Sequence, residues 1–496
     1  MIKRLFHVAW ACGLVASVMS CEDQKFNDVT VDVDRVHVAT LSEEMQKVRD
    51  YVPEYAVMAH RGSTFWTPEE TEAAYRWARE IGADYLECDM QVSKDGVVLA
   101  LHDTDLKRTT NIADVFGETL PTALRKEYYE KLGYTAEQID SLLLVDTKNF
   151  VPNYPSSYTY YELMHLDAGR WFNESSLEQA RAGFVEQHQY ISTLEDLVMY
   201  SKGYRLKRYK AGETDPFGLW KNPEGERVVT GMTATNKTIT NPINFVTVDK
   251  IVKYDFEYVI DTKADGSALS GNIPGIYIEF KEPWLNPAGF EQMVYDELSE
   301  LHMNIITEPA NENEPFYKDH KVNVGNTNGK VVLQTFSLQS LVQVSKVFEG
   351  KVPMCFLLWL GSGATDLTYD DPTGYASFIN LGVQYKAHFI GPCIGGAPND
   401  YPELNKPWQN HLIHRAKMKN HPYTFDTYDQ MAKYFGQYNY GVEGGAMFKA
   451  PYLDALFTNH SDMSLQYMIN FNWRSKDAPQ TVPDARQLLE ELGYEK

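Results

Sequence analysis

Two short apolar segments of the chain end in closely spaced charged residues. Residues 86–89 hold Glu87 and Asp89 two positions apart, and residues 278–281 hold Glu279 and Lys281 at the same spacing. Because side chains alternate between the two faces of a strand, each pair points to one side. Three converging carboxylates repel one another and raise one another's pKa unless a cation neutralises them. All-oxygen ligation predicts one hard divalent cation, Ca²⁺ or Mg²⁺, rather than zinc.

Two histidines accompany these acids. His60, followed by Arg61, ends one apolar run, and His102 ends another. Imidazoles can accept or donate a proton near neutral pH, so the pair suits acid–base catalysis. A single histidine at a strand end is more often structural, and a lone Glu-x-Asp is common. The joint pattern is much less common, and it predicts His60 and His102 as catalytic residues.

The pattern of apolar runs indicates which fold must position these groups. Eight candidate strands alternate mostly with helix-like stretches, which is typical of an α/β protein, a (β/α)8 TIM barrel. In such a barrel the active groups lie at the carboxyl ends of the strands, where the polar residues of these runs fall. The candidate strands are residues 57–60, 85–92, 276–281, 331–336, 354–360, 389–393, 422–425 and 453–459.

Two features interrupt the predicted barrel. A Gly-containing turn at residues 93–96 predicts a hairpin after the second strand, which returns His102 over the barrel mouth. Residues 202–272 are polar and too long for a plain loop, so we interpret them as an inserted subdomain before the third strand. The insertion either shapes substrate access or is a decoration unrelated to the substrate. The barrel domain is expected over residues 51–470, with a C-terminal tail at 471–496.

The first residues resemble an export signal. Lys3 and Arg4 precede a short apolar run, and Cys21 follows a small residue, as in a bacterial lipobox. We therefore expect residues 1–20 to be a lipoprotein signal peptide, Cys21 to be lipidated, and residues 21–50 to form a tether with a short helix. The alternative is an ordinary cleaved signal. The expected location is the bacterial cell envelope, with a membrane anchor at Cys21, facing the periplasm or the cell surface.

The charge of the chain limits its partners. Lys and Arg number 46 and Asp and Glu number 68, so the net charge is -22. Such a surface repels polyanions, which excludes nucleic acid as an expected partner. If the substrate is a small anion such as a phosphodiester, a metal ion and one or two basic residues must supply local positive charge.

Several motifs together resemble the glycerophosphodiester phosphodiesterase family, most closely its periplasmic bacterial branch in a lipoprotein form. The resemblance spans about Ala56 to Met468, with residues 202–272 unmatched. The motifs are His60-Arg61-Gly62, Pro68-Glu69-Glu70-Thr71, residues 82–89, Lys94-Asp95-Gly96, His102-Asp103, Arg108-Thr109-Thr110, residues 275–284, Gln334-Thr335-Phe336 and residues 421–425.

The resemblance implies a metal-dependent hydrolysis of glycerophosphodiesters, small molecules that are cleaved to sn-glycerol 3-phosphate and an alcohol. It implies Glu87, Asp89 and Glu279 as metal ligands and His60 and His102 as the acid–base pair. Arg61 and Lys281 match phosphate-contacting positions, and Glu69 matches the Glu of a Pro-Glu-Asn-Thr motif that contacts substrate. The sequence departs from the family at Glu70, which replaces Asn, and in residues 457–462. Glu70 adds a carboxylate that is expected to weaken binding of an anionic leaving group.

Three alternatives remain beside this hypothesis. One is a catalytically weak binding lipoprotein on the same barrel, although the intact histidines and acids argue against it. A glycosidase with paired carboxylates would not explain the two histidines and Lys281. A phosphodiesterase that acts on larger lipids or wall polymers would use the insertion for selection. The sequence leaves open the headgroup, the metal, the oligomeric state and which histidine is the acid.

Overall fold

The computed structural model describes residues 33–359, 368–369, 371–436 and 451–496 of the chain. Eight parallel strands follow the order β14-β13-β12-β11-β8-β2-β1-β15. Phe425, just beyond β14, pairs with Thr458 of β15, which brings the two ends of the sheet together. The predicted (β/α)8 barrel is therefore confirmed. Its strands are β1 (Ala56–Ala59), β2 (Tyr85–Val92), β8 (Gly275–Phe280), β11 (Val331–Thr335), β12 (Met354–Leu358), β13 (Phe389–Pro392), β14 (Lys419–Asn420) and β15 (Ala455–Thr458).

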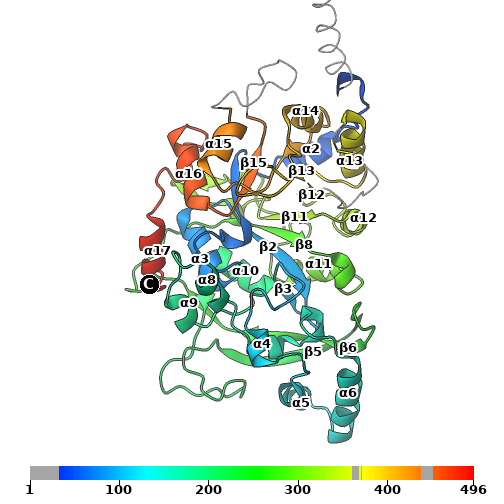
Figure 1. The fold of residues 1–496 in the computed structure, drawn as a ribbon, viewed down its shortest axis with the longest axis vertical. Helices are drawn as coiled ribbons and strands as arrows, with labels where there is room; N and C mark the ends of the chain where they lie inside the picture. Colours follow the sequence, from blue (N-terminus) through cyan, green and yellow to red (C-terminus); the bar gives the residue numbers. More distant parts are fainter. Residues whose placement is uncertain (1–32, 360–367, 370, 437–450) are drawn as a thin grey trace, which may run out of the picture.

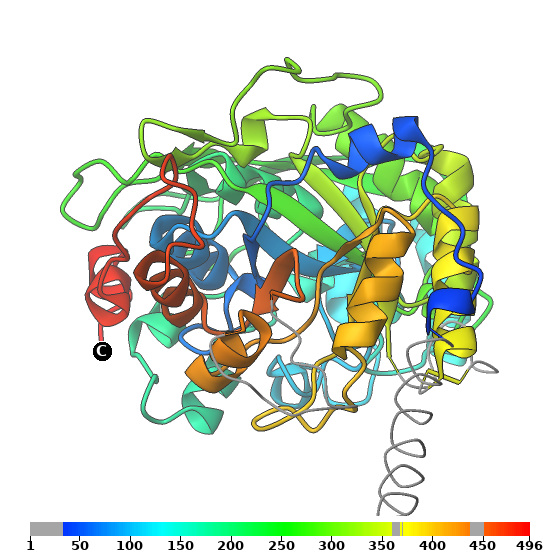
Figure 2. The same ribbon diagram turned by 90° about the horizontal axis from the view of Figure 1, so that it is seen from above.

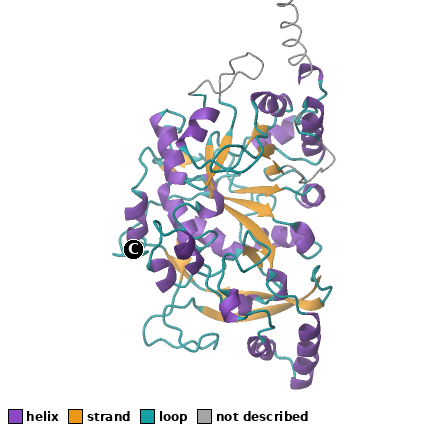
Figure 3. Cartoon of the chain, in the orientation of Figure 1, coloured by secondary structure: helices purple, strands orange, loops and turns teal. Residues whose placement is uncertain are grey.

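A helix follows each barrel strand along the chain, and the helices surround the strands (Figures 2 and 3). They are α3 (Glu72–Ile81), α10 (Leu194–Ser201), α11 (Phe290–Glu300), α12 (Leu338–Val347), α13 (Pro372–Gln384), α14 (Pro407–Arg415), α15 (Tyr428–Tyr434) and α16 (Ser461–Asn470).

Local sequence signals account for the barrel elements. Helix α3 begins where the Thr71 side chain accepts a hydrogen bond from the Ala74 N–H, and it ends at Gly82, whose φ of 100° is left-handed. Strands β1, β2 and β8 are buried along their whole length. Parallel strands covered on both faces are continuously apolar for this reason, so charged residues among them need a functional explanation.

The seventh strand lies earlier than predicted. The sequence pattern favoured residues 422–425, whereas β14 is Lys419–Asn420 and the following residues pair only at the isolated positions Tyr423 and Phe425. Pro422 has no backbone N–H, so it cannot complete a regular ladder there.

The hairpin after the second strand is present: β3 (Val98–Ala100) pairs antiparallel with β2. The expected insertion holds two strand pairs, of which the β5–β6 hairpin is the longer. A helical segment between β3 and α10 also lies outside the alternation of strand and helix that builds the barrel. The sequence pattern did not distinguish it from the barrel helices. These extra elements are α4 (Ile112–Val115), α5 (Thr122–Lys131), α6 (Ala136–Asn149), α7 (Tyr160–Leu163), α8 (Arg170–Ser175), α9 (Gly183–Glu186), β4 (Tyr204–Leu206), β5 (Val229–Thr240), β6 (Thr247–Phe256), β7 (Tyr258–Ile260), β9 (Tyr317–Lys318) and β10 (Lys321–Val322).

The β5–β6 hairpin and helices α5 and α6 lie together at one end of the molecule (Figure 1). The Asn241 side chain donates to the Ser156 carbonyl at 2.7 Å, and the Tyr254 hydroxyl donates to Asp95 at 2.7 Å. Buried hydrogen bonds therefore join the insertion to the turn of the β2–β3 hairpin, through Asp95, and to the segment after α6, through Ser156.

Both described ends of the chain are packed on the barrel. The Ala39 N–H donates to Asn380 of α13 at 2.7 Å, and helix α2 (Glu43–Arg49) follows. At the other end, α17 (Ala485–Glu491) covers α3, and the Trp77 indole donates to the Ala485 carbonyl at 3.0 Å. The predicted signal peptide at residues 1–20 and Cys21 lie outside the described residues. Among the residues that are described, no helix has the length and apolar character needed to cross a bilayer.

Candidate active site

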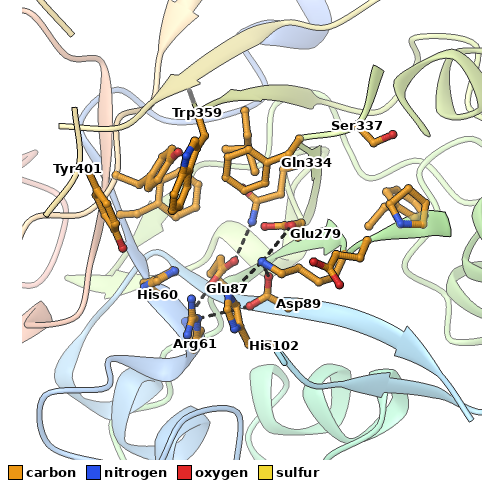
Figure 4. A pocket seen from close by; sticks show the side chains of 18 of the residues that line it. His60, Arg61, Glu87, Asp89, His102, Glu279, Gln334, Ser337, Trp359 and Tyr401 are labelled. Atoms are coloured by element: carbon orange, nitrogen blue, oxygen red, sulfur yellow. Dashed lines mark hydrogen bonds and ion pairs between the residues drawn. The ribbon is translucent and has the colours of Figure 1, made fainter. Parts of the chain in front are cut away.

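A pocket of about 360 Å³ opens at the carboxyl ends of the barrel strands (Figure 4). It brings together seven of the eight site residues that the sequence predicted around the barrel, and Glu69 is the exception. Its lining consists of His60, Arg61, Glu87, Asp89, His102, Glu279, Phe280, Lys281, Glu282, Pro283, Trp284, Gln334, Phe336, Ser337, Leu357, Trp359, Tyr401, Tyr423 and Phe457.

Strand register explains how the acids meet. Strands β2 and β8 are parallel neighbours, and Asp89 lies directly beside Glu279 across them. Glu87, two residues before Asp89, points to the same face. One carboxylate oxygen from each of the three residues lies within 4.8 Å of the others. We call Glu87, Asp89 and Glu279 the acid cluster.

The acid cluster is buried and its charges oppose one another. Burial raises the pKa of Glu87 well above its ordinary value, and the Asp89 charge adds to this. Burial also raises the pKa of Glu279, to about 8, although Lys281 acts in the opposite direction. For Asp89, burial opposes ionisation, but Lys281, His102 and Arg61 together lower its pKa. The three groups cannot all be charged at neutral pH without further positive charge nearby.

The donor set fits a divalent cation. Three carboxylates at strand ends offer hard oxygen ligands. Asp89 Oδ2 is buried and accepts no hydrogen bond from any residue that the structure describes, so this lone pair is available to a cation. The residues present therefore match the oxygen-only site that the sequence predicted.

Two basic side chains border the acid cluster. Lys281 Nζ lies 3.5 Å from carboxylate oxygens of both Asp89 and Glu279. Arg61 Nε lies 3.4 Å from Asp89 Oδ2, and the Arg61 backbone N–H donates to Glu87 at 2.7 Å. Arg61 has a left-handed backbone, with φ of 52°, in the turn that ends β1. Gly62 follows because a Cβ there would lie 2.5 Å from the Ala74 Cβ.

The two histidines are held through different partners. His60 Nδ1 donates to Asn459 Oδ1 at 2.6 Å, whereas His102 Nδ1 donates to Asp103 Oδ1 at 2.5 Å. In both rings Nε2 is left for other partners, and His102 Nε2 accepts a hydrogen bond from Lys281 Nζ at 2.9 Å. Burial, with the charge of Arg61, lowers the pKa of His60 to about 3, and the same two causes lower the pKa of His102.

The predicted substrate-binding residue Glu69 lies beside the pocket. Its carboxylate accepts hydrogen bonds from Arg108 at 2.5 and 3.0 Å, and it lies 3.6 Å from Arg61. Glu70, expected to place an unfavourable charge near the leaving group, is buried and accepts a hydrogen bond from the Asp89 N–H at 2.7 Å. Burial and the Asp89 charge raise the pKa of Glu70 well above its ordinary value. Glu70 therefore supports the strand that carries Asp89.

Sequence reasoning gave no role to three residues that contact the site. Asn459 and Asp103 hold the histidines, and the Gln334 amide donates to Glu87 at 2.7 Å. Gln334 could have been found as a polar residue near the end of a buried strand. Asp103 follows His102 directly, so the sequence itself places a carboxylate next to the imidazole. Asn459 is 399 residues from His60, so no local pattern connects them.

The site is an acid cluster beside two histidines at the mouth of a (β/α)8 barrel. Residues 60–213 match the model of the glycerophosphoryl diester phosphodiesterase family. That segment begins at His60 and includes Glu87, Asp89 and His102. This part of the chain is therefore similar to the glycerophosphoryl diester phosphodiesterase family.

Curated relatives also match a part of the chain. A glycerophosphodiester phosphodiesterase of Bacillus subtilis is 28% identical over 141 residues, which is 28% of this chain and 34% of the relative. A mouse glycerophosphoinositol inositolphosphodiesterase is 32% identical over 130 residues, 26% of this chain and 18% of the relative. The matches thus span about a third or less of each relative's length. A solved Oleispira antarctica phosphodiesterase, in complex with the product sn-glycerol-3-phosphate, aligns at 14% identity over 84% of this chain and 97% of that one, with a TM-score of 0.42.

Proposed function

We propose that this chain hydrolyses glycerophosphodiesters to sn-glycerol 3-phosphate and an alcohol, with one divalent cation, Ca²⁺ or Mg²⁺, and two histidines. The observation that carries the proposal is the meeting of the acid cluster with His60, His102, Arg61 and Lys281 in one pocket. A phosphodiester resists hydrolysis because its anion repels nucleophiles and its alkoxide leaves poorly. A site that neutralises the anion and protonates the alkoxide addresses both obstacles.

Glu87, Asp89 and Glu279 would hold the cation, which supplies positive charge to the phosphoryl oxygens when bound. Arg61 and Lys281 add fixed positive charge at the edge of the acid cluster. Ion pairs with the acids hold both side chains in place before the substrate binds. The phosphate is therefore expected to bind between these two side chains.

The partners of the histidines support different roles. The Asp103 carboxylate stabilises the imidazolium that forms when His102 takes a proton, so His102 is proposed as the base for the attacking hydroxyl. His60 is held by the neutral Asn459 amide, and the charge of a bound phosphate would favour its protonated form. We assign His60 to protonation of the departing alcohol oxygen. The attacking hydroxyl is proposed to be the neighbouring glycerol hydroxyl, which gives a cyclic phosphate that water then opens.

A panel of glycerophosphodiesters tests the activity directly. Release of sn-glycerol 3-phosphate is measured with and without chelator and after addition of Ca²⁺ or Mg²⁺. The proposal expects release that chelator abolishes and one of the two ions restores. Absence of release from every member of the panel at any metal concentration would contradict it. A rapidly quenched reaction should contain the cyclic phosphate.

We further propose that the mature chain is a lipoprotein of the bacterial cell envelope, anchored at Cys21. The support is the basic and apolar run before Cys21. Metabolic labelling with a fatty acid analogue, compared between the natural chain and Cys21→Ser, tests it. Equal labelling of both would rule out this anchor.

A further inference from the structure

Four aromatic side chains form one side of the active-site pocket. The rings of Trp359 and Tyr401 have centroids 5.4 Å apart, those of Tyr401 and Tyr423 are 6.1 Å apart, and those of Tyr423 and Phe336 are 5.7 Å apart. All four residues line the pocket. We call Trp359, Tyr401, Tyr423 and Phe336 the aromatic wall.

The aromatic wall is built from segments that follow four different strands. Phe336 follows β11, Trp359 follows β12, Tyr401 lies after β13 and Tyr423 lies after β14. The Trp359 side chain is 43% exposed although it is large and apolar. A large ring exposed in a concave pocket indicates a surface that a ligand covers, because such area is costly to leave in water.

The aromatic wall begins at the phosphate-binding groups and extends away from them. Lys281 Nζ lies 5.8 Å from the Phe336 ring centroid. Figure 4 shows Trp359, Tyr401 and His60 toward one side of the pocket, with the acid cluster nearer the centre of the view. A diester whose phosphate lies at Lys281 and Arg61 can therefore extend one of its two alcohols along these rings, on the side of His60.

The angles between the rings favour a rounded cation over a flat ligand. Successive planes are inclined by 49°, 58° and 87°, so the rings that line the pocket do not form one flat platform. A cation within about 6 Å of aromatic faces is attracted by the ring quadrupoles. Glu282 lines the same pocket, and no ion pair joins its carboxylate to another residue that the structure describes. The net charge of -22 also favours binding of a cation.

A polyol would find fewer partners on this surface. Recognition of several hydroxyl groups needs convergent hydrogen-bonding side chains. The Tyr423 hydroxyl donates to the Leu358 carbonyl at 3.0 Å, so that ring presents its face rather than its polar end. Phe336 has no hydrogen-bonding atom on its side chain. These two rings of the aromatic wall therefore offer apolar and quadrupolar contacts.

We infer that the aromatic wall binds the alcohol headgroup of the substrate and selects an alcohol that carries a quaternary ammonium group, as choline does. The inference rests on the proposed diester hydrolysis and adds the class of headgroup. The trimethylammonium group lies against Trp359 and Tyr401, and the ester oxygen is left near His60.

Two esters of matched shape test the inference. Glycerophosphocholine is compared with the glycerophosphodiester of 3,3-dimethylbutanol, in which carbon replaces the charged nitrogen. The natural chain is expected to hydrolyse the choline ester with a kcat/KM about tenfold higher, because the cation–π attraction is lost in the neutral ester. Equal kcat/KM for the two esters, or a higher value for glycerophosphoinositol, would overturn the inference.

Variants locate the preference. Trp359→Ala and Tyr401→Ala should each reduce the choline preference to threefold or less. Phe245→Ala removes a ring that is 79% exposed at the tip of the β5–β6 hairpin, far in sequence from the site, and should leave every ratio unchanged. A Trp359→Ala variant that loses activity equally on all esters would contradict a headgroup role.

A binding measurement separates this inference from the proposed activity. Calorimetric titration of the natural chain with phosphocholine and with the phosphate ester of 3,3-dimethylbutanol needs no turnover. Tighter binding of phosphocholine, lost in Trp359→Ala, supports the aromatic wall even if no diester is hydrolysed. Hydrolysis without any preference for the charged headgroup would retain the proposed function and reject the inference.

Discussion

Two regions of this protein gather carboxylates, and only one of them has the geometry of a metal site. The first is the acid cluster at the barrel mouth. The second is a cavity of about 300 Å³ between the β5–β6 hairpin and helix α11, lined by Glu195, Asp296, Glu297 and Glu300. We call these four residues the insertion-facing acids. Both regions are partly or fully buried, and both include lysines.

The difference lies in how the backbone directs the acids. In the acid cluster, adjacent parallel strands fix Asp89 beside Glu279. Three of the insertion-facing acids project from α11, where Asp296 pairs with Lys237 at 3.1 Å and Glu300 pairs with Lys253 at 2.8 Å. Within the part of the chain that the structure describes, Glu87, Asp89 and Glu279 are the one group of acidic, histidine or cysteine residues that converges as a metal site would require.

The remaining insertion-facing acids respond to burial by holding protons. Burial, with the charge of Glu195, raises the pKa of Glu297 to about 8, and burial, with the charge of Asp196, raises the pKa of Glu195 to about 7. Helix geometry spreads neighbouring acids around an axis, whereas strand ends bring alternate residues to one point. The type of element that carries the acids, strand or helix, therefore predicts a metal site better than the number of acids does.

The largest expected effect is loss of turnover when a histidine is removed. His60→Ala and His102→Ala should each lower kcat by about a thousandfold, because each removes a proton-transfer group. Metal affinity, measured by calorimetry, should remain close to that of the natural chain. The exposed His302→Ala serves as the control and should keep full activity. Near-normal turnover in both active-site variants would show that the catalytic groups lie elsewhere.

The second effect compares the two acidic regions directly. Glu279→Gln should weaken divalent metal binding by tenfold or more, since it replaces a charged ligand by a neutral amide. Glu297→Gln makes the same chemical change among the insertion-facing acids and should leave metal affinity and kcat unchanged. Calorimetric titration with Ca²⁺ and Mg²⁺ measures both. Equal losses in the two variants would remove the distinction between the regions.

A smaller effect is expected from the residue behind His60. Asn459→Ala removes the hydrogen bond to Nδ1 and should lower kcat by about tenfold with little change in KM, because the ring loses its orientation. Asn459→Asp should restore part of the rate and move the His60 limb of the pH–rate profile to higher pH, since a carboxylate favours the imidazolium. A rate in Asn459→Ala equal to that of the natural chain would show that His60 needs no such support.

The smallest effect concerns stability. The folded-state pKa of Glu297, about 8, lies above its ordinary value of 4.5, so the folded protein binds more protons than the unfolded chain between these values. Stability from this group is present below about pH 4.5 and is lost as pH rises toward 8. Glu297→Gln should therefore increase the free energy of unfolding at pH 9 and change it little at pH 4. Denaturant unfolding at the two pH values measures it, and an equal effect at both would contradict the assignment.

Local sequence patterns predicted most of the barrel strands and the face to which their acidic side chains point. Apolar runs predicted seven of the eight strands close to their observed places, because buried parallel strands leave a continuous signal. The seventh was misplaced, since Pro422 ends the regular ladder within an apolar stretch. The helical segment between β3 and α10 was not distinguished from barrel helices, because both carry the same helical signal and differ only in what they pack against.

The sequence by itself determined that Glu87 and Asp89 share a face, that His60 and His102 end apolar runs, and that the chain carries a large negative charge. These follow from side-chain alternation and composition, which act over a few residues or over the whole chain. Only the tertiary structure decided that Asp89 meets Glu279, that Asn459 holds His60 and that four loops form the aromatic wall. Such contacts join segments that are far apart along the chain, and strand register and core packing fix them after the barrel closes.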